Sequence, residues 1–135
     1  MKILRFVAAS AAFFAICIGA SSLSPAQAVF DNDSGDLTFV NPLNWDNDIA
    51  PTLSSGDSFI SNTLDVTIGL GDAAEFQALY LGDEAGISSL IMTGGTLAGD
   101  NFRIGAGTGG TGTFTLLDGA VTMVCLLYTS DAADE

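Results

Sequence analysis

Apolar and polar residues alternate along much of the segment 64–124, and glycines interrupt the alternation. Its clearest stretch begins at Leu64, where every second residue is apolar through Leu70. A period of two over this length predicts a half-buried β-strand. Shorter runs with the same period predict strands at 79–81, 102–104 and 114–116. Residues 73–77 are expected to form a loop, and residues 37–40 a further short strand.

The pattern between residues 79 and 123 occurs twice. Residues 79–82 return as 102–105, an offset of 23, and residues 90–92 return as 114–116, an offset of 24. A unit this short cannot bury its own apolar face, so it must stack on its neighbours. The repeat therefore predicts an all-β fold of the β-solenoid type. An antiparallel β-meander or sandwich is the alternative.

Stacked repeats make a definite prediction about strand pairing. Leu81 should lie opposite Ile104, and Leu90 opposite Phe114, at the spacing of about 4.8 Å between hydrogen-bonded strands. A meander would instead pair 79–81 with 90–92 through a hairpin, but their connection is long for a tight turn, which favours the parallel arrangement. If the apolar column is buried, Phe114→Ala should cost about 3–5 kcal/mol.

The two ends of the chain differ from its middle. Lys2 and Arg5 precede an apolar run, and Ala26-Gln27-Ala28 follows it, which is typical of a secretory signal peptide cleaved after Ala28. The alternative, a transmembrane anchor, needs about 20 apolar residues. Residues 125–135 resemble the in-frame translation of a transposon end and sequencing adapter. The predicted organisation is a signal peptide (1–28), an N-terminal capping region (29–63), truncated solenoid repeats (64–124) and an adapter-derived tail (125–135).

Composition narrows the function classes. The chain has a formal net charge of −13 and no histidine, and Arg103 is its only basic residue after Arg5. Such a surface repels nucleic acid and anionic membranes, because phosphate binding needs basic side chains. Imidazole chemistry is excluded. Both cysteines, Cys17 and Cys125, lie outside 29–124, so no disulfide framework is expected there.

Two features near the N-terminus are candidates for binding. Asp31, Asp33 and Asp36 are weak calcium-ligand candidates, because closely spaced carboxylates with glycine can surround Ca²⁺. Their spacing does not fit an EF-hand loop, and a solvated turn is the favoured interpretation. Trp45 lies among Asn and Asp residues, as in sugar-binding platforms, but its position before the repeats favours a cap over the solenoid end.

Several motifs in order carry a family resemblance: Asn44-Trp45, Pro51, Gly56-Asp57, Val66-Thr67-Ile68, Leu79-Tyr80-Leu81-Gly82, Gly94-Gly95-Thr96-Leu97, Phe102-Arg103-Ile104-Gly105 and Gly112-Thr113-Phe114-Thr115-Leu116. This series resembles exported bacterial autotransporter-passenger-like glycine-rich repeat proteins, which often end in a PEP-CTERM sorting signal or another surface anchor. The resemblance implies a right-handed parallel β-helix and a secreted or cell-surface location. It carries over no catalytic residue.

We expect a structural or adhesive surface protein that contacts extracellular polymers or cell surfaces and needs no cofactor. A β-helical polysaccharide lyase or hydrolase, with its site in a missing portion, is one alternative, and a calcium-stabilised binding module is another. Enzymes of this kind need clustered carboxylates with a basic or metal partner. The acidic residues among the repeats instead fall beside glycine turns, where solvated corners are expected; these are Asp72, Asp83, Glu84, Asp100 and Asp118.

Overall fold

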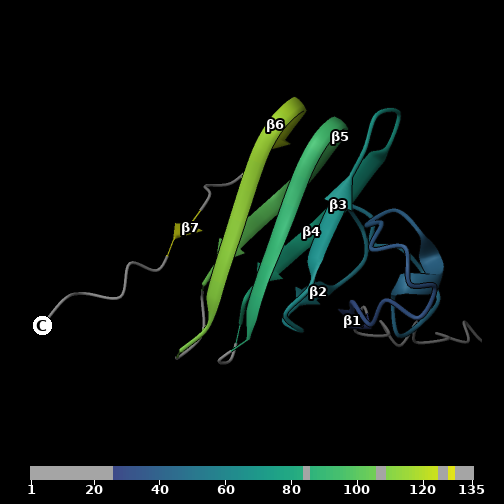
Figure 1. Cartoon of the computed structure of the whole chain (residues 1–135), viewed down its shortest axis with the longest axis vertical. Helices are drawn as coiled ribbons and strands as arrows, with labels where there is room; N and C mark the ends of the chain where they lie inside the picture. Colours follow the sequence, from purple (N-terminus) through teal and green to yellow (C-terminus); the bar gives the residue numbers. More distant parts are fainter. Residues whose placement is uncertain (1–25, 84–85, 106–108, 125–127, 130–135) are drawn as a thin grey trace, which may run out of the picture.

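The computed structural model describes residues 26–83, 86–105, 109–124 and 128–129. This part of the chain is all-β, apart from one short 3-10 helix, and its strands form one sheet (Figure 1). The predicted signal peptide lies almost entirely outside the described residues, as does most of the predicted adapter-derived tail. The elements are β1 (Ala28–Val29), η1 (Pro42–Asn44), β2 (Asp57–Ile60), β3 (Asp65–Ile68), β4 (Ala73–Leu81), β5 (Ile87–Ile104), β6 (Thr111–Met123) and β7 (Tyr128–Thr129).

All pairings between these strands are parallel, in the register that the repeat predicts. Leu81 pairs with Ile104, and Leu90 pairs with Phe114. Both predicted pairs are therefore confirmed, and the antiparallel meander is wrong for these strands. Within the described residues, the only antiparallel contact between strand-like segments is an isolated bridge from Phe30 to Trp45.

The pairings fall into three ladders, named A, B and C here. In the segments that form these ladders, partners in adjacent strands are 21 to 24 residues apart in the sequence, whereas the two-residue strands β1 and β7 pair with offsets of 30 and 25. β5 contributes to all three ladders, and in Figure 1 the long strands β5 and β6 lie side by side and bend sharply. Ladder A contains 57–60, 78–81 and 101–104; ladder B contains 65–68, 89–92 and 113–116; ladder C contains 73–76, 96–99 and 120–123.

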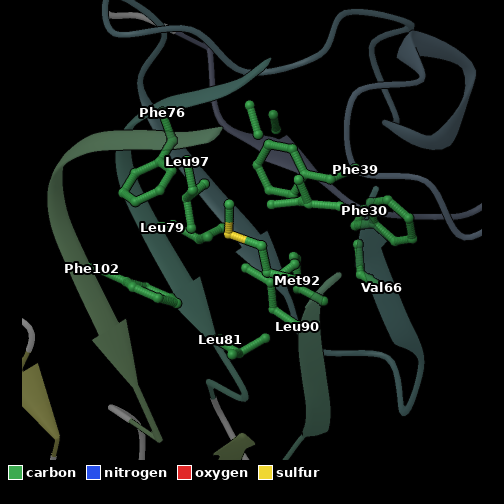
Figure 2. Close-up of a cluster of buried hydrophobic side chains, with 14 of the residues drawn as sticks. Phe30, Phe39, Val66, Phe76, Leu79, Leu81, Leu90, Met92, Leu97 and Phe102 are labelled. Carbon is green, nitrogen blue, oxygen red and sulfur yellow. The ribbon is translucent and has the colours of Figure 1, made fainter. Parts of the chain in front are cut away.

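The apolar core lies between the ladders. Leu79, Leu81 and Phe102 are completely buried, whereas Arg103 is exposed, as the alternation predicts. Figure 2 shows labelled side chains from β3, β4 and β5 pointing into a common interior. Because parallel strands keep equivalent residues on the same face, each inward position continues into the next repeat. β6 is the exception, since among the described strands it pairs with β5 alone and its Leu116 is 49% exposed.

Three local predictions are wrong. Residues 73–77 belong to strand β4 rather than a loop, because ladder C supplies hydrogen-bonding partners and buries Phe76. The segment 37–40 makes only an isolated parallel bridge, from Thr38 to Thr67. Leu70 is 92% exposed, since strand β3 has already ended at Ile68.

Some glycines allow neighbouring chain segments to pack closely, in addition to forming turns. Gly82 has a φ of +69°, as expected of a corner, and a Cβ there would also lie 2.2 Å from the Thr111 carbonyl oxygen. Gly99 lies inside β5, where a Cβ would meet the Phe76 ring at 2.2 Å. The glycine pattern of the sequence predicts corners with positive φ at ten positions: Gly82, Gly86, Gly94, Gly95, Gly105, Gly107, Gly109, Gly110, Gly112 and Gly119. The described ones without it are Gly86, Gly94, Gly110 and Gly112, and Gly107 lies outside the described residues.

Candidate functional site

The outer face of ladder A carries a row of side chains in register. Phe59 pairs with Tyr80, and Tyr80 pairs with Arg103. The Phe59 and Tyr80 rings are stacked, with centroids 4.7 Å apart and an interplanar angle of 14°, and the Arg103 guanidinium carbon lies 5.2 Å from the Tyr80 centroid. The sequence repeat predicts that Tyr80 and Arg103 face outward. Sequence reasoning missed Phe59, which lies in the predicted capping region but already belongs to the ladder.

This row is suited to holding strands together rather than to stacking a sugar ring. A sugar platform presents an aromatic face to solvent, but here the Tyr80 ring stacks on Phe59 and lies beneath Arg103. An aromatic pair contributes about 0.5–1.5 kcal/mol beyond its buried area. An exposed cation–π contact contributes about 0.5–1 kcal/mol. The row therefore reinforces the parallel register of β2, β4 and β5.

A polar groove of about 660 Å³ runs beside the start of ladder A. Its lining comes from three parallel strands and the segment before β1, so its shape depends on the register of the sheet. Carboxylates and primary amides line the groove. Carboxylates accept hydrogen bonds from hydroxyl groups, and primary amides both accept hydrogen bonds from them and donate to them. The polar lining residues are Gln27, Asp57, Gln77, Asp100 and Asn101. Of these, only Asp100 was singled out in the sequence, as a residue expected at a solvated corner, and it lies in β5 between the segments of ladder C and ladder A.

A second, smaller cavity of about 400 Å³ lies nearby. Val29 and Phe59 give it an apolar wall, and Asp83 and Ser61 add polar groups. Two of the other acidic residues accept backbone hydrogen bonds at 2.7 Å: Asp72 from the Gly69 amide at a turn, and Asp118 from the Gly119 amide within β6. Glu84 lies outside the described residues.

The N-terminal aspartates form turns. Asp31 accepts a hydrogen bond from the Asp33 amide, and Asp36 accepts one from the Thr38 amide. Asp36 also accepts hydrogen bonds from the side-chain amides of Asn44 (2.6 Å) and Asn41 (2.7 Å). These donors, led by the Thr38 amide, hold the pKa of the Asp36 carboxyl well below its usual range.

The three N-terminal carboxylates do not gather around one point. In the described part of the chain, no three acidic, histidine or cysteine side chains form a group that could hold a metal ion. The favoured interpretation of a polar turn agrees with the hydrogen bonds that Asp31 and Asp36 accept from the chain. The calcium assignment for Asp31, Asp33 and Asp36 stays a prediction.

Trp45 is completely buried, which rules out its use as an exposed sugar platform. Its ring makes edge contacts with Phe30 (5.2 Å between centroids) and Phe39 (5.1 Å). Its Nε1–H donates a 2.8 Å hydrogen bond to the Phe39 carbonyl oxygen. The favoured interpretation, a packed cap at the N-terminal end of the sheet, agrees with these contacts.

Comparisons of the chain with protein-family models, with curated proteins and with solved structures gave no match. Among the residues that the structure describes, no helix is long and apolar enough to cross a membrane.

Proposed function

We propose that the chain is the N-terminal part of an exported structural or adhesive repeat protein of the bacterial cell surface. The observation that carries this proposal is the constant spacing of the three parallel ladders, whose partners are 21 to 24 residues apart. The chain visits ladder A, then B, then C, and returns to A. Such a path is that of a coil in which every turn is one repeat, and it supports the right-handed β-helix that the family resemblance implies.

A coil of this kind suits a structural role. Each repeat contacts only its neighbours, so additional repeats lengthen the array without changing its cross-section. The outer faces of successive repeats then form long continuous surfaces. Such surfaces can contact a polymer along its length, and the row of Phe59, Tyr80 and Arg103 would keep them in register.

The polar groove beside ladder A is the best candidate for contact with a polymer. Asp57 and Asp100 make it acidic, and Gln77 and Asn101 supply donors and acceptors. Carboxylates repel polyanions but form charge-assisted hydrogen bonds with hydroxyl groups. The proposed ligand is therefore a neutral, hydroxyl-rich polysaccharide at the cell surface.

Binding to soluble polysaccharides tests this assignment. We expect the chain to bind at least one member of a panel of neutral glucans and galactomannans, and not alginate, a polyanion. Gln77→Ala should weaken that binding about 3–10-fold, the range for losing one or two hydrogen bonds. Glu75→Ala is the matched control, since Glu75 is also exposed on β4 but does not line the groove.

Two results would contradict the assignment: binding to alginate alone, or equal loss of binding in both variants. The polysaccharide-active enzyme and the calcium-stabilised module stay alternative predictions for the whole protein.

A further inference from the structure

The backbone nitrogen of Val29 lies beside a carboxylate. The Val29 amide donates a 2.9 Å hydrogen bond to Asp46 Oδ1, and the Asp46 amide donates a 2.9 Å hydrogen bond to the Val29 carbonyl oxygen. The next residue is held as well, because the Phe30 amide donates to the Phe59 carbonyl oxygen at 2.9 Å. These three hydrogen bonds involve only Val29 and later residues, so cleavage after Ala28 would leave their partners in place.

Cleavage after Ala28 would change the chemistry of this nitrogen. The peptide amide would become an α-ammonium group, which carries a positive charge at neutral and lower pH because its usual pKa is about 7.7–8.0. We propose that Asp46 is the binding site for the ammonium group of the mature N-terminus. This inference rests on the export and cleavage assumed in the proposed function. Processing would then convert a neutral hydrogen bond into an ion pair that fastens the first strand to the cap.

Cleavage at this bond would also change the surroundings of a buried hydroxyl group. Ser58 is completely buried, and its hydroxyl finds no hydrogen-bond partner among the described residues. Its partner in β1 is Ala28, which is 2% exposed. A buried hydroxyl without a partner is unfavourable. Removal of Ala28 would uncover this edge of β2 and let water reach Ser58.

The burial of Ala28 also fixes the order of events. Ala28, the residue before the scissile bond, is paired in β1 and buried. A protease therefore could not bind it in its active site while the cap is folded. Cleavage would have to precede folding of the cap, and the new terminus would then bind Asp46 as the cap folds.

A double-mutant cycle separates the effect of the α-ammonium charge from that of the hydrogen bond between the Val29 nitrogen and Asp46. The chain from Val29 onward contains no lysine, so acetylating reagents modify only its α-amino group. The acetylated terminus keeps an N–H donor but loses the charge. Thermal melting at pH 6 would compare Asp46 and Asp46→Asn, each with a free and an acetylated terminus.

We expect Asp46→Asn to lower the Tm by about 2–5 °C more in the free form than in the acetylated form, the range for an exposed ion pair in a small domain. The difference should fade in 1 M NaCl, where the Debye length is about 3 Å. Asp48→Asn removes the same charge two residues away and should show no such difference. Asp46→Lys should enlarge it, because two positive charges would then meet.

Equal effects of Asp46→Asn in both forms would overturn the proposal, as would an Asp48→Asn difference of the same size. N-terminal sequencing of exported protein tests the cleavage separately. A terminus other than Val29 would refute the processing site, whereas the cycle would still report on the Asp46 site itself.

Discussion

Two phenylalanine truncations, in Phe102 and Phe114, test whether the apolar core ends at β6. Phe102 is completely buried, and its ring centroid lies 5.7 Å from that of Phe76 and 5.3 Å from that of Phe114. Phe102→Ala should therefore destabilise the fold by about 3–5 kcal/mol, the range for a fully enclosed aromatic side chain. This is a large share of the roughly 5–15 kcal/mol that stabilises a typical small domain.

A smaller loss of stability is expected for Phe114→Ala. Phe114 pairs with Leu90 as expected, but it lies in β6 and is only partly buried. Water can enter the space that Phe114→Ala leaves, so the cost of an empty cavity is largely absent. We expect about 1–2 kcal/mol, from partial loss of a burial term of 1.5–3 kcal/mol. The sequence prediction of 3–5 kcal/mol assumed a fully buried column, which the partial burial of Phe114 contradicts.

Urea denaturation provides the measurement. The fluorescence of the buried Trp45 reports unfolding, and midpoints at constant slope give the change in free energy. Leu70→Ala is the control, since this side chain is 92% exposed and should change stability by less than about 0.5 kcal/mol. Equal costs for Phe102→Ala and Phe114→Ala would contradict the partial burial of Phe114. A cost below about 1 kcal/mol for Phe102→Ala would refute the core itself.

Three further predictions follow from local contacts. Gly82→Ala should lower the Tm more than Gly35→Ala. Both glycines have a positive φ, but only at Gly82 would the added Cβ clash with a neighbour, the Thr111 carbonyl oxygen. Equal decreases in Tm would argue against close packing at Gly82. The pKa of the Asp36 carboxyl is lower in the folded state than its usual value of about 3.9, so its stabilisation is present above about pH 4 and is lost as the pH falls below that value. Melting curves between pH 6 and pH 3 should therefore show a smaller acid-induced loss for Asp36→Asn than for the unchanged chain, and parallel curves would contradict this. Calcium at millimolar concentration should leave the Tm within about 1 °C of that in chelator, because a ligand that does not bind the folded state adds no stability; a clear rise would restore the calcium-stabilised module.

The predictable part of the fold came from its repetition. The offset of 23 to 24 residues between similar segments was enough to place Leu81 opposite Ile104 and Leu90 opposite Phe114. Parallel pairing follows because stacked repeats run in the same direction, and the period of two then assigns Tyr80 and Arg103 to the outer face. These conclusions need only the order of residues, since register and facing are both periodic properties of the chain.

The candidate groove could be predicted only in part. From the sequence, Asp100 was expected only at a solvated corner, and Asp57, Gln77 and Asn101 had no signal that set them apart from other surface residues. They line one groove because the register of three strands distant in sequence brings them together at the start of ladder A. The calcium candidates show the reverse case: Asp31 and Asp36 are close in sequence, but each carboxylate accepts a hydrogen bond from the backbone amide two residues later, and no metal-holding group forms among the described residues.

By itself the sequence determined the class of fold, the parallel register and the outward residues of the repeats, all of which depend on period and spacing. Only the tertiary structure decided that residues 73–77 extend β4, that Gly99 makes room for Phe76, and that Asp46 meets the Val29 nitrogen. The physical reason is that the local sequence is ambiguous at each of these places. Neighbouring segments, brought close by the fold, supply the hydrogen bonds and the steric limits that select one conformation.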